Sequence, residues 1–284
     1  MTASIVVGLD GTEQANAAAE WAADEAALRG TRVHLVHVQE PSPEVLLPLV
    51  PREHPEAWAE ELLARTAAAL RERRPGLGVT TRLLPSQPVP SLVAAAEDAE
   101  LLVLGSRAMS GVAGYLVGSV GMTVAGRTEC PVVLVRSLGT PDPQGTVAVG
   151  VDLREPVDDI LDFAFAEAVR RRAPLEAVYA QQLPLYARIG PSVTPDFRVT
   201  VAPEIQRSLD DLLASWREAF PDVSTTGRVA IGSAAQELVQ TSEGAALLVV
   251  GRRSRRSTLG SHLGSVAHAV LHHSRAPVAV VPHD

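Results

Sequence analysis

The sequence contains no lysine, and all 25 of its basic residues are arginine. This excludes the phosphate-binding lysine of a P-loop and any Schiff base with a carbonyl substrate or pyridoxal phosphate. A phosphate bound by this chain would be held by backbone amides, hydroxyl groups or arginine. The single cysteine, Cys130, excludes an internal disulfide and favours a reducing cytoplasm as the compartment.

Aromatic residues make up only 4% of the chain, so stacking platforms for nucleic acid are few. The formal net charge is -8 at pH 7, and Asp plus Glu outnumber arginine in both halves. This balance disfavours nucleic acid and anionic membranes as partners. The sequence has no apolar segment of transmembrane length and no signal-peptide pattern, which again predicts a cytoplasmic protein.

Alanine, valine and leucine dominate the hydrophobic residues, which form 46% of a chain of 284 residues. This length suits two domains. Short β-branched runs alternate with alanine-rich helical stretches, as in βαβ units with a parallel sheet. Strands are expected at 4–9, 32–38, 78–84, 100–104 and 131–135, then at 146–151, 175–180, 223–231, 246–250 and 277–281. Helices near 13–29, 56–74, 88–98 and 118–128 are expected to cover the first sheet.

The two halves of the chain repeat one another. The segment "IVVGLDGTEQANAAAEW" from residue 5 is echoed by "VAVGVDLREPVDDILDF" from residue 147, which aligns Asp10 with Asp152. Later, "ELLVLGSR" and "CPVVLV" are echoed by "ALLVVGRR" and "APVAVV". We infer a tandem duplication with domains at 1–139 and 144–284, joined by a linker rich in Gly and Pro near 137–146.

Each half is predicted to be a Rossmann-like, doubly wound α/β unit with a five-stranded parallel sheet and about four helices. Ligands of such sheets bind outside the C-terminal strand ends, at the switch point of the strand order. Asp10 follows the first strand, Val38 ends the second and Gly105 ends the fourth. These three residues are therefore expected to face one crevice.

A loop rich in small residues follows the fourth strand, with the sequence "GSRAMSGVAGYLVGSV" from 105 to 120. Backbone amides of such a loop, and the N–H groups in the first turn of the next helix, commonly bind a phosphate. The alternative interpretation is that its glycines only turn the chain, namely Gly105, Gly111, Gly114 and Gly118.

These duplicated motifs resemble the tandem universal stress protein family, which are nucleotide-binding α/β proteins. The resemblance implies ATP or ADP as the ligand, with or without Mg²⁺, on a loop of the form G-x2-G-x9-G-[ST]. The matching residues are Gly105, Gly118 and Ser119 in the first unit and Gly251, Gly264 and Ser265 in the second. Ala108 and Ser254 replace the middle glycine. If that position needs a positive φ, the replacement costs roughly 1 kcal/mol or more.

The resemblance also assigns the other contacts of the nucleotide. The aspartate after the first strand would lie near the adenosine, and the backbone that ends the second strand would contact the adenine. Those positions are Gly8, Asp10 and Val38 in the first unit and Gly150, Asp152 and Ala180 in the second. The remaining residues expected at the nucleotide are Ser106, Arg107, Ala108, Gly111, Val120, Arg252, Arg253, Ser254 and Val266. The edge strands "PVVLV" and "PVAVV" are expected to pair the units about a pseudo-twofold axis, and a homodimer is a further option.

The second site departs from the first. Its turn reads "DLREP" instead of "DGT", which puts Leu153 and Arg154 where the chain would approach the ligand closely. The first unit is therefore predicted to be the better nucleotide binder. Against this, "GRRSRRS" supplies four arginines that would offset polyphosphate charge, namely Arg252, Arg253, Arg255 and Arg256. The alternative is a solvated charge run.

Several other features carry weaker predictions. His268 and His272 share a helix face with His273 adjacent, but no third ligand lies at metal-site spacing, so no metal site is expected. The segments 39–58 and 181–204, rich in proline, are interpreted as lids or as variable surface loops. His37 either borders the crevice or lies in the core. Aromatic neighbours available to a base are Trp58, Tyr179 and Tyr186.

No nucleophile elbow or candidate general base is recognisable, so the chain is not expected to be an enzyme beyond slow, incidental ATP hydrolysis. The sequence predicts a cytoplasmic regulatory protein of the stress response that binds ATP or ADP and changes its choice of an unknown protein partner. The alternative is a scaffold with the same fold that binds proteins but no nucleotide.

Overall fold

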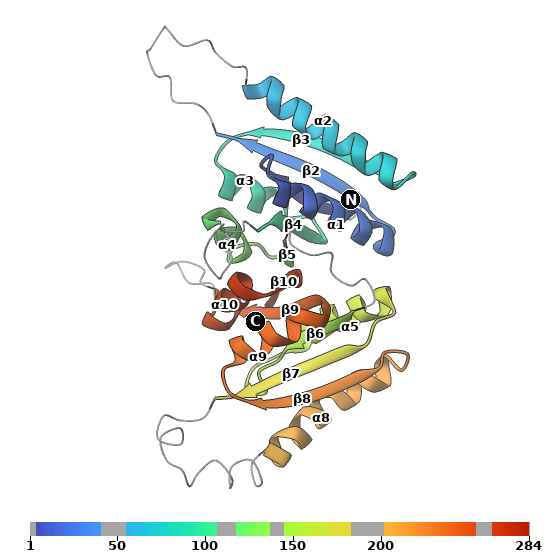
Figure 1. Cartoon of the computed structure of the whole chain (residues 1–284), viewed down its shortest axis with the longest axis vertical. Coiled ribbons are helices and arrows are strands. Elements are labelled where there is room, and N and C mark those ends of the chain that lie inside the picture. The colour runs from blue at the N-terminus through green and yellow to red at the C-terminus, as the bar shows by residue number, and fades with distance from the viewer. Residues whose placement is uncertain are drawn as a thin grey trace. The chain divides into compact units, whose positions relative to one another are not determined.

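The structure is a computed structural model and describes residues 4–40, 55–106, 118–136, 145–182, 202–253 and 263–283. The chain forms two compact units, Met1–Ser137 and Leu138–Asp284. Each contributes five strands that alternate with helices along the chain (Figure 1). The predicted strands are all present, and the first-unit helices lie where the sequence predicts them, with ends that differ by up to three residues. The two five-stranded, doubly wound parallel units of the prediction are confirmed.

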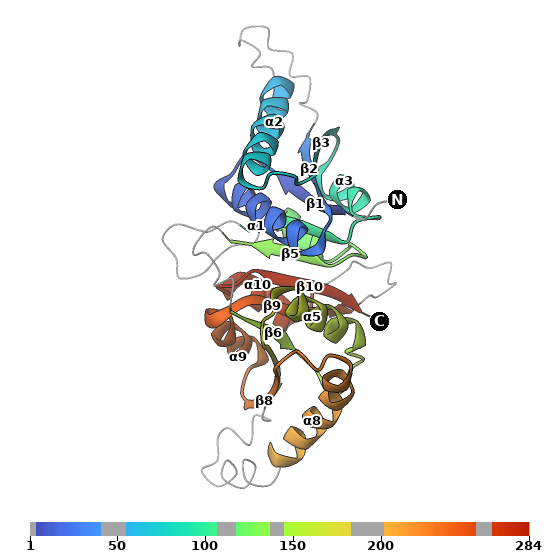
Figure 2. The same ribbon diagram turned by 90° about the vertical axis from the view of Figure 1, so that its right-hand side faces the viewer.

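The first unit orders its strands β3-β2-β1-β4-β5, all parallel. Its elements are β1 (Ser4–Leu9), α1 (Glu13–Arg29), β2 (Arg32–Gln39), α2 (Pro55–Arg73), β3 (Val79–Pro85), α3 (Pro88–Ala95), β4 (Leu101–Gly105), α4 (Ser119–Ala125) and β5 (Val132–Val135). Helices α1 and α2 cover one face of these strands, and α3 packs on the other beside α4 (Figure 2).

The second unit repeats this order as β8-β7-β6-β9-β10, again all parallel. Its elements are β6 (Thr146–Gly150), α5 (Asp158–Arg171), β7 (Leu175–Gln181), α8 (Ala202–Ala219), β8 (Thr225–Ile231), α9 (Ala234–Thr241), the 3₁₀ turn η1 (Ser242–Gly244), β9 (Ala245–Arg253), α10 (Ser265–His273) and β10 (Val278–His283). Helices α5 and α8 lie on one face and α9 and α10 on the other.

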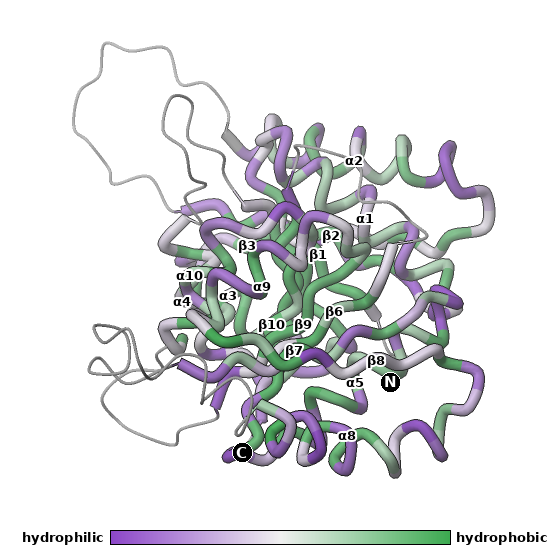
Figure 3. Tube along the Cα trace, turned by 60° about the horizontal axis from the view of Figure 1, so that its bottom comes forward, coloured by the Kyte–Doolittle hydropathy of each residue, from purple (hydrophilic) through white to green (hydrophobic). Residues whose placement is uncertain are grey.

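The apolar strand runs are buried because helices cover both faces of each sheet. Figure 3 shows the strands mostly in green, whereas the helices carry purple stretches. Helix α1 meets the sheet through alanines that are at most 2% exposed, namely Ala15, Ala18, Ala19, Ala22, Ala23 and Ala26. These small side chains let the helix backbone approach the strands closely, which matters at the site below.

Local signals set the ends of α1. The Thr12 hydroxyl accepts a hydrogen bond from the Ala15 amide at 3.2 Å, which caps the N-terminus. Gly30 ends the helix at φ 66°, a left-handed conformation that glycine adopts without strain. Arg172 takes the same conformation at φ 51° after α5, although it carries a side chain.

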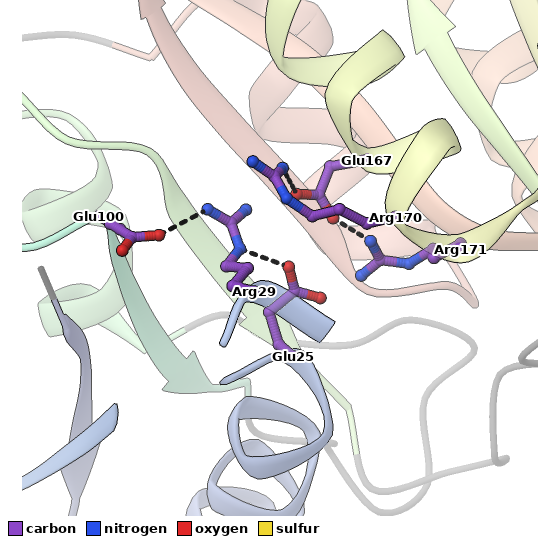
Figure 4. A network of polar contacts seen from close by, with 6 residues as sticks. All are labelled: Glu25, Arg29, Glu100, Glu167, Arg170 and Arg171. Atoms are coloured by element: carbon purple, nitrogen blue, oxygen red, sulfur yellow. Dashed lines mark hydrogen bonds and ion pairs between the residues drawn. The ribbon is translucent and has the colours of Figure 1, made fainter. Parts of the chain in front are cut away.

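Each unit also buries an ion pair within its first helix (Figure 4). Arg29 donates to Glu25 at 2.6 Å and to Glu100 at 3.2 Å. In the second unit Glu167 accepts from Arg170 at 2.7 Å and also from Arg171. Glu25 and Glu167 are at most 1% exposed and occupy equivalent places in the duplication.

None of the helices within the described ranges has the length and apolar character needed to cross a membrane.

Candidate functional site

The candidate site of the first unit lies where its strand order changes direction. The chain leaves β1 through α1 toward β2 on one side, while β4 pairs with β1 on the other. Asp10 follows the end of β1, and Gly105 is the last residue of β4. Val38 stands near the end of β2, beside Leu84 of β3. Because these strands are parallel, the three residues lie at the same carboxyl-terminal end of the sheet, as a shared crevice would require.

The carboxylate of Asp10 is oriented by its own turn. Its Oδ1 accepts hydrogen bonds from the Thr12 amide at 3.1 Å and from the Thr12 hydroxyl at 2.5 Å. Gly11 between them has a φ of 80°, which a residue with a side chain rarely adopts. The "DGT" turn thus aims an acidic group at the sheet edge and caps α1 at the same time.

Gly105 is explained by packing rather than by a ligand. A Cβ at this position would lie 2.5 Å from the Gln14 carbonyl carbon and 2.6 Å from the Ala15 nitrogen, both in the first turn of α1. Gly8 is similarly limited by the Leu104 side chain, 2.5 Å from its added Cβ. From the sequence, Gly105 was expected to let the backbone come close to a nucleotide. In the structure, it lets helix α1 come close to β4.

Ser106 also differs from its predicted role. Its amide donates to the Val135 carbonyl at 2.8 Å, and its hydroxyl donates to the same oxygen at 3.2 Å. The residue is 2% exposed. Ser106 was expected at the nucleotide, but its amide and hydroxyl both bond within the sheet, because β5 continues alongside the end of β4.

Gly118 and Gly264 present the opposite environment. They are the N-cap residues of α4 and α10, with φ of -57° and -60° and no side-chain cap. A Cβ added at either one meets no other atom of the described residues within 4 Å. Ser119 and Ser265, the first residues of these helices, are exposed. The position of an added Cβ beside each N-cap residue is therefore clear of described atoms, and the N–H groups of a helix's first turn have no partner within the helix.

The region expected to hold a base contains an aromatic pair. His37 Nδ1 lies 2.8 Å from the Leu9 carbonyl oxygen, and its ring meets the Trp58 ring edge-on at 5.5 Å. The Trp58 indole also lies against Gly11, 2.8 Å from an added Cβ there, yet Trp58 is 51% exposed. The sequence supplied both residues as candidates but gave no signal that they touch, because they are far apart in the chain.

In the second unit the equivalent aspartate is engaged by an arginine. Arg154 donates through Nε to Asp152 Oδ1 and through Nη2 to Oδ2, each at 3.0 Å. These bonds hold the pKa of the Asp152 carboxyl below its usual value. Tyr179, at the place of His37, donates its hydroxyl to Gln181 at 2.8 Å, and burial raises the pKa of this phenol.

Two of the four arginines of the predicted second-unit cluster, Arg252 and Arg253, lie in the described residues. Arg253 Nη2 donates to Glu155 Oε1, and Arg252 is only 6% exposed. One of the predicted cations is thus neutralised and another is buried. Sequence reasoning missed Glu155, since its partner is 98 residues away.

Some predicted residues lie in other surroundings or outside the described ranges. Gly150 and Gly251 face Leu238 and Ile160, respectively. Val120, Ala180 and Val266 are partly exposed near the strand and helix ends. His268 and His272 have ring centroids 4.6 Å apart, and the described residues contain no group of three or more metal-ligating side chains. The residues outside the described ranges are Arg107, Ala108, Gly111, Gly114, Tyr186, Ser254, Arg255 and Arg256.

Comparison with known proteins gives one consistent result. Residues 1–136 and 145–282 each match the model of the universal stress protein family. A universal stress protein of Mycobacterium tuberculosis is 37% identical, over 97% of this chain and 96% of its own length. Another from the same organism is 34% identical over 97% of this chain and 95% of its own length. The crystal structure of a universal stress protein from Archaeoglobus fulgidus shares the fold, with a TM-score of 0.70 at 17% identity, and covers 99% of this chain and 98% of that one. The chain belongs to the universal stress protein family, with two such domains in tandem.

Proposed function

We propose that this chain is a cytoplasmic regulatory protein that binds ATP or ADP in its first unit and changes its protein partner with nucleotide occupancy. One observation carries the proposal. At the edge of the sheet where β1 and β4 end, an oriented Asp10 carboxylate follows β1, and Gly118 caps α4 at a position where an added Cβ meets no described atom within 4 Å.

The two groups suit the two ends of a nucleotide. A carboxylate accepts hydrogen bonds from ribose hydroxyls, whereas the amides of a helix's first turn attract phosphate oxygens. Since the chain has no lysine, the phosphates would depend on these amides, on the Ser119 hydroxyl and on arginine. Mg²⁺ would bind together with the nucleotide, coordinated by its phosphates, because the described residues contain no group of three metal-ligating side chains.

The proposal contains no catalytic step. Asp10 accepts two hydrogen bonds from Thr12, an arrangement that suits a fixed acceptor better than a base that takes a proton from water. Any hydrolysis of ATP is expected to be slow and incidental.

A scaffold without a nucleotide is the second candidate. The observation in its favour is that Gly105 and Ser106, two residues of the predicted loop, are fully used by packing and by the sheet. On this alternative the chain keeps the fold of the family, but its surfaces bind proteins and no nucleotide.

The experiment that separates the two begins with the full-length protein purified gently and then denatured. Mass spectrometry of the released small molecules is expected to find ATP or ADP, and calorimetric titration of the stripped protein is expected to show binding. Gly118→Leu should weaken binding by at least about ten-fold, or 1.4 kcal/mol, by filling the space beside α4. Its circular dichroism should match the wild type, because a Cβ added at Gly118 meets no described atom within 4 Å. Absence of both bound nucleotide and millimolar binding would favour the scaffold.

A further inference from the structure

The turn after β6 differs from the turn after β1 in a way that bears on ligand binding. Arg154 occupies the place of Thr12 in the duplication. The Thr12 hydroxyl, on a short side chain, donates to Asp10 and caps α1 by accepting from the Ala15 amide. Arg154 instead reaches both carboxylate oxygens of Asp152, and its amide donates to Oδ1 as well, at 3.1 Å.

The backbone of this turn also takes a different path. Gly11 has a positive φ, whereas Arg172 is the only residue other than glycine with a positive φ in the described part of the chain, so Leu153 does not copy the Gly11 conformation. Helix α1 begins at Glu13, directly after Thr12, but α5 begins only at Asp158. The helix start has moved away from the aspartate, and no side chain caps it.

A second ion pair joins this turn to the neighbouring strand. Glu155 accepts from Arg253, the last residue of β9, and β9 pairs directly with β6. The pair therefore links the chain that follows β6 to the end of β9 at the switch point of the second sheet. A nucleotide in that crevice would have to lie where the two segments are joined.

Charge strength decides which partner Asp152 keeps. Hydrogen bonds between a guanidinium and a carboxylate are roughly twice as strong as those between neutral groups. Both partners are ionised in the two bonds from Arg154, whereas a ribose hydroxyl would offer the same carboxylate only a neutral donor. The Arg154 side chain is 76% exposed, so the pair adds little to the stability of the fold. To exclude a nucleotide, Arg154 needs only to bind Asp152 better than a ribose hydroxyl does, and the two residues are already close within one turn.

We infer that the chain binds one nucleotide, in the first unit, and that Arg154 and Arg253 hold the second crevice in a form that excludes it. This inference rests on the proposed function. The second unit keeps the fold of a nucleotide-binding unit while its own ion pairs occupy the polar groups that a ligand would use. Arg154 is the residue that sets the difference between the two sites.

The test is the stoichiometry of ATP binding to the full-length chain, measured by calorimetry and by equilibrium dialysis. The wild type is expected to bind one equivalent, and Gly118→Leu is expected to bind that equivalent at least about ten-fold more weakly. The double variant Arg154→Thr/Arg253→Ser, which restores the first-unit residue at 154, is expected to gain a second equivalent. The variant Arg65→Gln, at an exposed ion pair on α2, also removes a positive charge and should keep one equivalent.

Two equivalents in the wild type, or an unchanged affinity in Gly118→Leu, would overturn the inference while leaving nucleotide binding intact. One equivalent in the double variant would overturn the role given to the two arginines. No binding by any of the proteins would instead refute the proposed function, so the two failures are distinct.

Discussion

Replacement of Gly105 by alanine tests whether a glycine is required at this position for the close packing of helix α1. The added Cβ would lie 2.5–2.6 Å from three backbone atoms of Gln14 and Ala15, in the capped first turn of α1. Overpacking a well-packed site costs about 1–3 kcal/mol. Because the obstructing atoms are backbone and cannot rotate away, we expect the upper end of that range, about 3 kcal/mol.

Gly118→Ala is the matched control from the same loop. Its φ of -57° suits any residue, and its added Cβ meets no described atom within 4 Å. Alanine is a poorer N-cap than glycine by roughly half a kcal/mol, but it also lowers the entropy of the unfolded chain by about 0.4–1 kcal/mol. These effects nearly cancel, so the change in stability should stay within about 0.5 kcal/mol.

The assay is urea unfolding followed by tryptophan fluorescence in a Trp216→Phe background. The remaining tryptophans, Trp21 and Trp58, then report on the first unit alone. With a slope of about 2 kcal/mol per molar urea, Gly105→Ala should lower the midpoint by roughly 1.5 M. Equal midpoints for the two alanine variants would refute the packing explanation and favour a role of Gly105 in ligand binding.

Three further predictions concern separate contacts. Titration with ATP should change the emission of the half-exposed Trp58, and Trp58→Phe should abolish the change while retaining nucleotide binding; an unaltered signal in that variant would place the base elsewhere. Glu167→Gln should destabilise the second unit by about 3 kcal/mol in urea, because it removes one partner of a buried ion pair. The exposed Glu61→Gln should cost less than about 0.5 kcal/mol, and similar losses in the two would contradict the burial argument. The Asp152 carboxyl should titrate below its usual pKa of about 3.9, so the stability it gains from Arg154 is present above that pH and lost as pH falls through the lowered value. Carbon NMR of the carboxyl should show a return toward the usual pKa in Arg154→Ser, and an unshifted titration would show that the pair does not form in solution.

The sequence alone determined the alternation of strands and helices and the duplication. These are local properties, because buried parallel strands read as short apolar runs and helices repeat their alanines with the turn of the helix. The ends of α1 could also be predicted from the sequence, because Thr12 and Gly30 act on backbone groups only a few residues away. Strand order in a doubly wound sheet then places Asp10 at the switch point, where a crevice is expected, without further information.

Tertiary structure alone decided what the residues at that crevice do. Gly105 looked like a phosphate-loop glycine, but its space is taken by a helix that begins 92 residues earlier in the chain. Ser106 bonds to β5, Trp58 rests on His37, and Arg253 pairs with Glu155. Each of these contacts joins segments that meet only when the layers pack, and no local pattern of hydrophobicity or turn residues records which side chains then face one another.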